Sequence, residues 1–136
     1  MSWDVYVTKF SRPYQSVSDI AEDETGVALG TREFVHSAIS KVFVGTDWSD
    51  PAWGHFESEF GSIEFNNGGK EPLQGFMMHV RASDEIVALI VELCKQQSWS
   101  AIDSSTGDFL EKVDDPAKGL SAWRNYRDQV FKRETD

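Results

Sequence analysis

The sequence contains almost no cysteine: Cys94 is the only one in 136 residues. A single cysteine excludes an internal disulfide, so a hydrophobic core must hold the fold, in a reducing compartment or in one where redox state is indifferent. No apolar run approaches the ~20 residues that cross a membrane. The opening MSWDVYVTKF also lacks the basic and apolar regions of a signal peptide. We therefore expect a cytoplasmic protein with no membrane contact.

Basic residues are scarce as well, and the imbalance is uneven along the chain. Lysine and arginine number 13 against 23 acidic residues, which gives a net charge of −10. Residues 1–66 hold eleven acids and four bases, a net of −7, whereas residues 67–136 hold twelve and nine, a net of −3. Such a surface repels phosphate backbones, which argues against nucleic-acid binding, and it attracts a basic protein. The alternative is that the acidity serves solubility alone.

Sequence motifs for metal, cofactor or catalytic chemistry are missing too. The histidines, His36, His55 and His79, stand in no H-x-x-x-H spacing of the kind that places two ligands on one metal ion. The NNGGK run at 66–70 lacks the G-x-x-x-x-G-K-[ST] pattern of a phosphate-binding loop. Cys94 falls on the apolar side of an expected helix, where a thiol is buried. We therefore predict no catalytic residue, no metal and no cofactor.

Hydrophobic residues, by contrast, are plentiful. They make up 40% of the chain and include nine phenylalanines and five tryptophans, a composition that excludes a disordered chain. Apolar periodicity, together with capping and turn residues, indicates the secondary-structure elements. Strands are expected at 3–9, 55–57, 62–66, 75–81, 99–103 and 108–111. Helices are expected to begin after the caps Thr31, Ser83 and Asp115.

These elements predict an α+β fold in the order β-α-β-β-β-α-β-β-α. We expect a single domain over residues 1–136, with helices packed on a mainly antiparallel sheet. Residues 11–30 are polar and read as a long loop, which is either ordered by packing or functional. The expected core residues are Phe34, Ile39, Phe76, Val80, Ile86, Ile90, Leu93 and Ile102.

The last expected helix carries a narrow apolar stripe formed by Leu120, Trp123, Tyr126 and Val130. Their spacing of three or four residues places them on one face of a helix. We expect this stripe to dock on the sheet of its own chain. The alternative is a helix used for dimerisation, because the sequence does not fix the oligomeric state.

The stretch GTDWSDPAWGHFESEF at 45–60 concentrates tryptophan and carboxylates. One interpretation is a protein-binding lip, in which the tryptophans anchor a partner and the carboxylates form a charged rim. The other is a structural corner, because SDPAWG is strong turn chemistry and indoles are mostly buried. Two acids here, Glu57 and Glu59, form either a carboxylate pair on one strand face or a wet face. The candidate binding residues are Asp47, Trp48, Asp50, Trp53, Glu57 and Glu59.

Six stretches spread over residues 1–131 stand out: MSWDVYV, SDPAWG, SIEFN, GFMMHVR, AIDSSTGDF and WRNYRDQV. Together they resemble a widespread family of small acidic bacterial proteins that has no assigned function. The chain has DWSDP and HVRAS where similar members have DFSDP and HVRGG, differences expected in surface loops. Because the family has no catalytic assignment, the resemblance transfers no site. A looser resemblance links the chain to the small acidic α+β immunity proteins that neutralise bacterial toxins.

We therefore predict a non-enzymatic protein-binding module of the immunity or adaptor type, which presents an acidic, tryptophan-bearing surface to a basic protein. The alternative is a small hydrolase-like enzyme, which needs a concave site that gathers His79, Glu57 or Asp103. A third possibility is a housekeeping role that the sequence does not identify.

Overall fold

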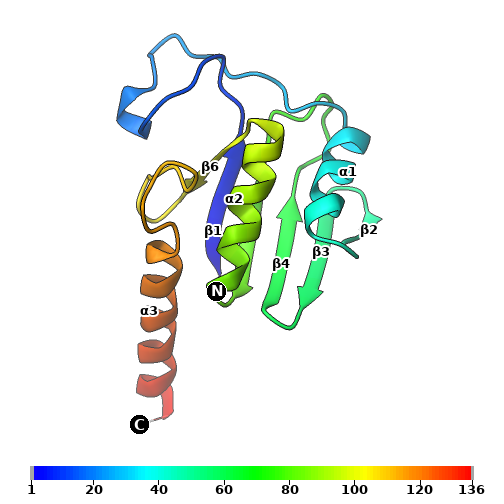
Figure 1. Ribbon diagram of the computed structural model, residues 1–136. Coiled ribbons are helices and arrows are strands. Elements are labelled where there is room, and N and C mark those ends of the chain that lie inside the picture. The colour runs from blue at the N-terminus through cyan, green and yellow to red at the C-terminus, as the bar shows by residue number, and fades with distance from the viewer. Residues whose placement is uncertain (1, 136) are drawn as a thin grey trace.

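A six-stranded antiparallel sheet organises the chain in the computed structural model, which describes residues 2–135 (Figure 1). The strands lie in the order β2-β3-β4-β5-β1-β6, and each neighbouring pair is antiparallel. Their bounds are Trp3–Thr8 (β1), Asp47–Asp50 (β2), Trp53–Ser58 (β3), Gly61–Asn66 (β4), Gly75–Ala82 (β5) and Ser100–Asp103 (β6). The helices are Arg32–Val42 (α1), Glu85–Gln97 (α2) and Lys118–Thr135 (α3), with a short 3₁₀ helix at Val17–Asp19 (η1). The predicted α+β class is confirmed.

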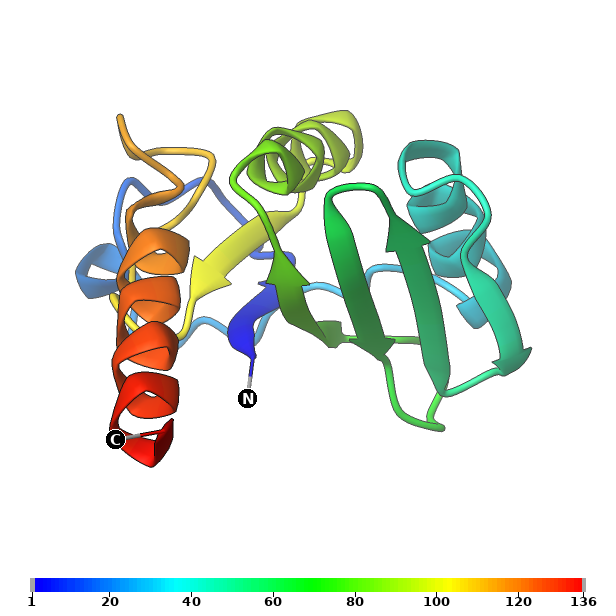
Figure 2. The same cartoon turned by 90° about the horizontal axis from the view of Figure 1, so that it is seen from below.

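Helices α1 and α2 both lie on one face of the sheet (Figure 2). Strand residues that point toward them, such as Val5, Phe65 and Val80, are fully buried and share one core with Ile39 of α1 and Ile90 of α2. The residues between them along each strand point the opposite way, because strand side chains alternate. The sheet thus has a helix-covered face and a second face, here called the open face, that neither α1 nor α2 covers.

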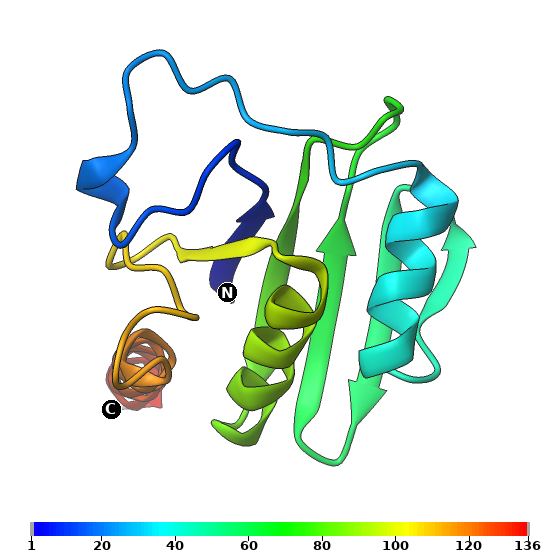
Figure 3. The ribbon, with the colours of Figure 1, turned by 45° about the horizontal axis from the view of Figure 1, so that its top comes forward.

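Residues 11–30 form the expected loop, which runs from β1 along the end of the sheet to α1 (Figure 3). Glu24 orders its first half, since its carboxylate accepts hydrogen bonds from the Ser11 amide and hydroxyl, the Tyr14 hydroxyl and the Gly26 amide. These bonds, above all that from the Ser11 hydroxyl, lower the pKa of Glu24 to about 2. Internal hydrogen bonding therefore keeps the loop in place.

The predicted helix caps meet different outcomes. The Thr31 hydroxyl accepts a hydrogen bond from the Phe34 amide at 3.1 Å, so this cap is confirmed for α1. Ser83 is wrong as the cap of α2, which begins at Glu85, because the Ser83 hydroxyl bonds the Glu85 carboxylate instead of a backbone amide. At the third helix, the Asp115 carbonyl accepts from the Lys118 amide in a turn, and α3 begins only after it.

The predicted element order is wrong in two places. Strand β2 was expected to be a turn; it pairs only with β3, at the edge of the sheet, where polar and charged residues are tolerated. Residues 108–111 were expected to be a strand, but only one bridge joins Phe109 to Ile102. Phe109 and Leu110 turn into the interior instead and are each 2% exposed. The observed order is β-α-β-β-β-β-α-β-α.

Two of the predicted core residues are wrong. Phe34 is 50% exposed, because it lies in the first turn of α1 and contacts Gly30 at the edge of the core. Ile102 is half-buried on the open face, because the register of β6 with β1 turns Ala101 and Asp103 inward instead. The other six are fully buried, as expected: Ile39, Phe76, Val80, Ile86, Ile90 and Leu93.

Helix α3 packs on the rest of the chain mainly through its beginning. Leu120 is fully buried and Trp123 packs against the core, whereas Tyr126 is 59% exposed. Arg124 Nη2 donates to Asp84 Oδ1 at 2.6 Å and so joins α3 to the start of α2. Beyond these contacts the helix leads away from the sheet (Figure 1). The predicted docking of the stripe is therefore confirmed at Leu120 and wrong at Tyr126.

Candidate functional site

Strand register assembles a line of titratable side chains across the open face. Asp47 pairs with His55, which pairs with Glu64. Glu64 pairs in turn with His79, and His79 with Asp4. These five positions, here called the charged row, belong to five neighbouring strands. Because neighbouring strands lie ~4.8 Å apart, the row spans roughly 19 Å.

A histidine–carboxylate hydrogen bond and an arginine–carboxylate ion pair orient the side chains around the charged row. His79 Nδ1 lies 2.9 Å from Asp4 Oδ1, and Arg81 Nη1 donates to Glu64 Oε1 at 3.0 Å. All four side chains are 26% to 41% exposed, so water screens both pairs. Exposed pairs of this kind contribute about 0–1 kcal/mol. They therefore set the geometry of the face more than its stability.

The outer end of the charged row is a stable anion. Asp47 Oδ1 accepts hydrogen bonds from the Ser49 hydroxyl at 2.6 Å and from the Ser49 amide at 2.8 Å. These bonds, together with the nearby His55, hold the pKa of Asp47 below its ordinary value. Asp47 thus stays ionised on the exposed edge strand at any pH near neutrality.

A second row, here called the apolar row, runs beside the charged row, two residues further along each of the four strands that the rows share. Its members are in register across β3, β4, β5, β1 and β6: Trp53, Asn66, Met77, Tyr6 and Ile102. All are partly accessible, and Tyr6 is 38% exposed. The Trp53 ring lies nearly parallel to the His79 imidazole, with ring centroids 6.0 Å apart. An exposed sheet face is ordinarily polar, so a row in which four of five strands contribute an apolar or aromatic side chain, all but Asn66 of β4, marks a candidate contact surface.

The predicted binding residues are divided between the two faces. Trp53 and Asp50 pair with each other at the open face, while Glu57 is exposed further along β3. Asp50 also has the predicted turn role, because its Oδ1 accepts from the Ala52 amide at 2.9 Å. All four predicted carboxylates are exposed, and both tryptophans are half-buried. The open face therefore brings together Asp47, Asp50, Trp53 and Glu57.

Trp48 lies apart from this group, on the helix-covered face. Its Nε1 donates to Ser40 Oγ at 3.1 Å, and its ring stacks on His36 with centroids 3.6 Å apart. It also lies directly over Gly54, where a side chain would overlap the indole. His36 Nε2 is 3.1 Å from Asn67 Oδ1, and burial lowers the pKa of His36. Trp48 thus fastens β2 and β3 to α1.

The predicted carboxylate pair is not formed on one strand face. Strand β3 ends at Ser58, whose hydroxyl accepts from the Phe60 amide at 3.1 Å and closes the turn to β4. Glu59 therefore stands in that turn, beyond the strand that carries Glu57.

The residues of the alternative enzyme site are not gathered either. His79 and Glu57 belong to the open face, whereas Asp103 is 1% exposed and lies against Gly119 at the start of α3. His55 and His79 face the same side, but Glu64 of the intervening strand separates them. Among the side chains of residues 2–132, no three His, Cys, Asp or Glu groups are placed to hold a metal ion.

Several open-face residues were not predicted as binding residues, namely Asp4, Tyr6, Glu64, Met77 and Arg81. The alternation of the strands at 3–9 and 75–81 already separates their outward positions from their inward ones. Assembly into rows depends on pairing between strands far apart in the chain, such as β1 with β5. The register between two such strands cannot be predicted from the sequence of either strand alone.

The chain matches no family model, no curated protein and no solved structure. Its resemblance to the family of small acidic proteins, and the looser one to immunity proteins, therefore stay predictions. Among residues 2–135, no helix is both long and apolar enough to cross a membrane.

Proposed function

We propose that the chain is a protein-binding module that docks a basic polypeptide on the open face of its sheet. The observation that carries this proposal is the pair of rows on that face: an accessible apolar row lies directly beside a charged row. Transient protein–protein interfaces commonly combine an apolar centre with a polar rim. Within the apolar row, Trp53 and Tyr6 are the residue types that contribute most to such contacts.

The charge of the open face supports a basic partner. Five carboxylates lie on or beside it: Asp4, Asp47, Asp50, Glu57 and Glu64. Against them stands Arg81, whose guanidinium pairs with Glu64. The face is therefore strongly negative in a chain whose net charge is −10. Such a field speeds the encounter with a positive partner and is weakened by salt.

Within this proposal, the protein-binding module is of the immunity or adaptor type. An immunity protein acts by covering its partner, so it needs a rigid surface of suitable charge and no catalytic group. The open face meets this requirement, since a six-stranded sheet with a full core supports it. The residues of the enzyme alternative, by contrast, lie on different faces.

Affinity capture with two matched variants tests the proposal. The open-face variant combines Tyr6→Thr with Glu57→Gln and Glu64→Gln. The control combines Tyr126→Thr with Glu33→Gln and Glu92→Gln, which are the same replacements at exposed positions on the helices. We expect wild type and control to capture the same basic protein from native lysate, and the open-face variant to lose it.

Salt and purified components complete this test. The captured protein should release at high ionic strength, and the purified pair should bind with an association rate that falls as salt rises. A partner that both variants retain equally would contradict the proposal, as would capture that salt does not affect.

A further inference from the structure

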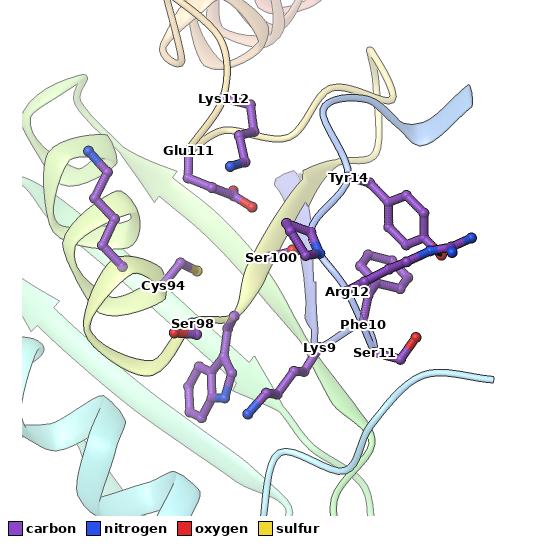
Figure 4. A pocket seen from close by; sticks show the side chains of 13 residues that line it. Lys9, Phe10, Ser11, Arg12, Tyr14, Cys94, Ser98, Ser100, Glu111 and Lys112 are labelled. Atoms are coloured by element: carbon purple, nitrogen blue, oxygen red, sulfur yellow. Dashed lines mark hydrogen bonds between the residues drawn. The ribbon is translucent and has the colours of Figure 1, made fainter. Parts of the chain in front are cut away.

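A cavity of about 440 Å³ opens at the end of α2, away from both rows of the open face. Three separate segments line it: the loop after β1, the stretch from α2 into β6, and the turn after Phe109. Figure 4 shows Phe10 and Tyr14 on one side, Cys94 on the other, and Lys9 and Lys112 at opposite ends. Its volume lies in the range of small-molecule sites, roughly 300–1,000 Å³.

The walls of the cavity are firmly placed. Phe10 packs edge-on against Tyr14 with ring centroids 5.5 Å apart, and Trp99 is 3% exposed within the core. The Tyr14 hydroxyl donates to Glu24 at 2.9 Å, in the same set of hydrogen bonds that orders the loop. The aromatic wall is therefore built into the fold and provides flat apolar surface for a ring.

The charge of the cavity is opposite to that of the whole chain. Four of the thirteen basic residues line it, against one acidic residue, Glu111. Arg12 already has a side-chain hydrogen-bond partner, since its Nε donates to the Tyr14 hydroxyl at 3.1 Å. The other three, Lys9, Lys95 and Lys112, make no ion pair with any side chain of residues 2–132.

The balance of charge decides what the cavity can hold. Glu111 and the carbonyl end of α2 oppose an anion, with about −1 and −0.5 charge. The four basic groups, the Arg12 guanidinium included, outweigh them and leave roughly +2.5, which attracts the −1.5 to −2 of a phosphate monoester more strongly than the −1 of a carboxylate. Lysine also binds phosphate as a point charge. The Ser98 and Ser100 hydroxyls at the same cavity supply neutral donors.

Cys94 contributes shape and not reactivity. Its thiol is fully buried, and burial together with the nearby Glu111 raises its pKa far above the ordinary value. The thiol therefore stays protonated, and only the thiolate is a nucleophile. The cavity is a binding site without an activated nucleophile at this position.

We infer that this cavity binds a phosphorylated small molecule with a flat ring: its basic lining attracts the phosphate, which a lysine at one end holds, and the Phe10–Tyr14 wall takes the ring. The site is independent of the proposed protein contact on the open face, so either can hold without the other.

Titration of the ¹⁵N-labelled full chain with 1-naphthyl phosphate, followed by NMR, tests this inference. We expect saturable shifts of the backbone amides at 9–12, 14, 98–100 and 111–112. Two partial probes separate the contributions: inorganic phosphate carries the charge alone, and 1-naphthol carries the ring alone. Each should bind at least roughly tenfold more weakly than the complete probe, because each loses one set of contacts.

Matched lysine variants complete the test. Lys9→Gln combined with Lys112→Gln should weaken binding of 1-naphthyl phosphate by roughly tenfold or more. Lys41→Gln combined with Lys70→Gln removes the same charge from exposed positions elsewhere and should leave binding unchanged. The amide spectra report whether each variant is folded. Absence of saturable shifts up to about 5 mM probe, or equal weakening by both variants, would overturn the inference.

Discussion

The two faces of one sheet differ in this molecule, since one is buried beneath helices and the other is accessible. On the helix-covered face, successive strands contribute fully buried residues such as Val5, Val80 and Phe65. On the open face, the alternate residues of the same strands, Tyr6, His79 and Glu64, stay accessible. The backbone hydrogen bonds are shared, so the difference comes from side chains alone. It shows that the core uses only the inward-facing side chains of each strand, which leaves the outward-facing side chains for recognition.

The largest effect expected from this comparison separates two adjacent methionines of β5. Met78 is fully buried beneath the helices, whereas Met77 is partly exposed in the apolar row. Met78→Ala leaves a cavity and should lower the free energy of unfolding by about 2–5 kcal/mol. Met77→Ala, the control with identical chemistry, should change it by less than about 1 kcal/mol. Urea unfolding measures both, and equal losses would show that the open face is also a structural core.

The next effect concerns the point where α3 joins the helix-covered face. A Cβ at Gly119 would overlap Asp103 Oδ2, which is buried. Gly119→Ala should therefore lower the free energy of unfolding by about 1–3 kcal/mol, as overpacking does. Gly69→Ala is the control, since no atom lies within 4 Å of the added Cβ. Thermal unfolding compares the two, and an unchanged midpoint for Gly119→Ala would place the start of α3 elsewhere.

A smaller effect depends on pH and belongs to Trp48 and its neighbours. Burial lowers the pKa of His36 in the folded chain, so the neutral imidazole is the form that packs on Trp48. The unfolded chain binds this proton more readily, so stability is complete above pH 6.5 and declines as pH falls below it.

Unfolding in urea at pH 7.5 and 5.5 measures this dependence. The wild type should lose more stability between the two pH values than His36→Gln, because the other titrating groups are the same in both. His55→Gln, at an exposed position, should behave as the wild type does. Parallel losses for wild type and His36→Gln would show that protonation of His36 does not weaken the fold.

The smallest effect on folding is expected where the effect on recognition is large. Asp47→Asn, Asp50→Asn, Glu57→Gln and Glu59→Gln together should leave the urea midpoint nearly unchanged. All four carboxylates are exposed, and an amide oxygen can still accept the turn bonds made by Asp47 and Asp50. Association with a basic partner should slow more than dissociation quickens, because rim charges act mainly on encounter. A large loss of stability would make the stretch a structural corner and nothing more.

Most of the fold follows from local sequence, and its exceptions have local reasons. Alternation in the first strand, the Thr31 cap and the hairpin near Ser58 are all short-range features, and each is observed. Strand β2 was missed because its Asp-Trp-Ser-Asp sequence is typical of a turn. It is a strand only because it pairs with β3. Ile102 was misplaced because burial in β6 depends on register with β1.

The candidate sites were less accessible to sequence reasoning. The stretch at 45–60 correctly drew attention to Trp53 and the exposed carboxylates, but not to Tyr6 and Met77, which β1 and β5 bring beside them. The cavity combines residues near 10, 95 and 111. Its excess of lysines is invisible in a chain that is acidic in both halves.

The central claim is that the open face, and not the helix-covered side, contacts a partner. A photo-activated cross-linker at Met77 samples the middle of the apolar row, and one at the exposed Ser37 of α1 samples the opposite side. In native lysate, the claim predicts that position 77 cross-links to one basic protein at low salt, that high salt abolishes this product, and that position 37 yields none. The same product from position 37, or none from position 77, would contradict it.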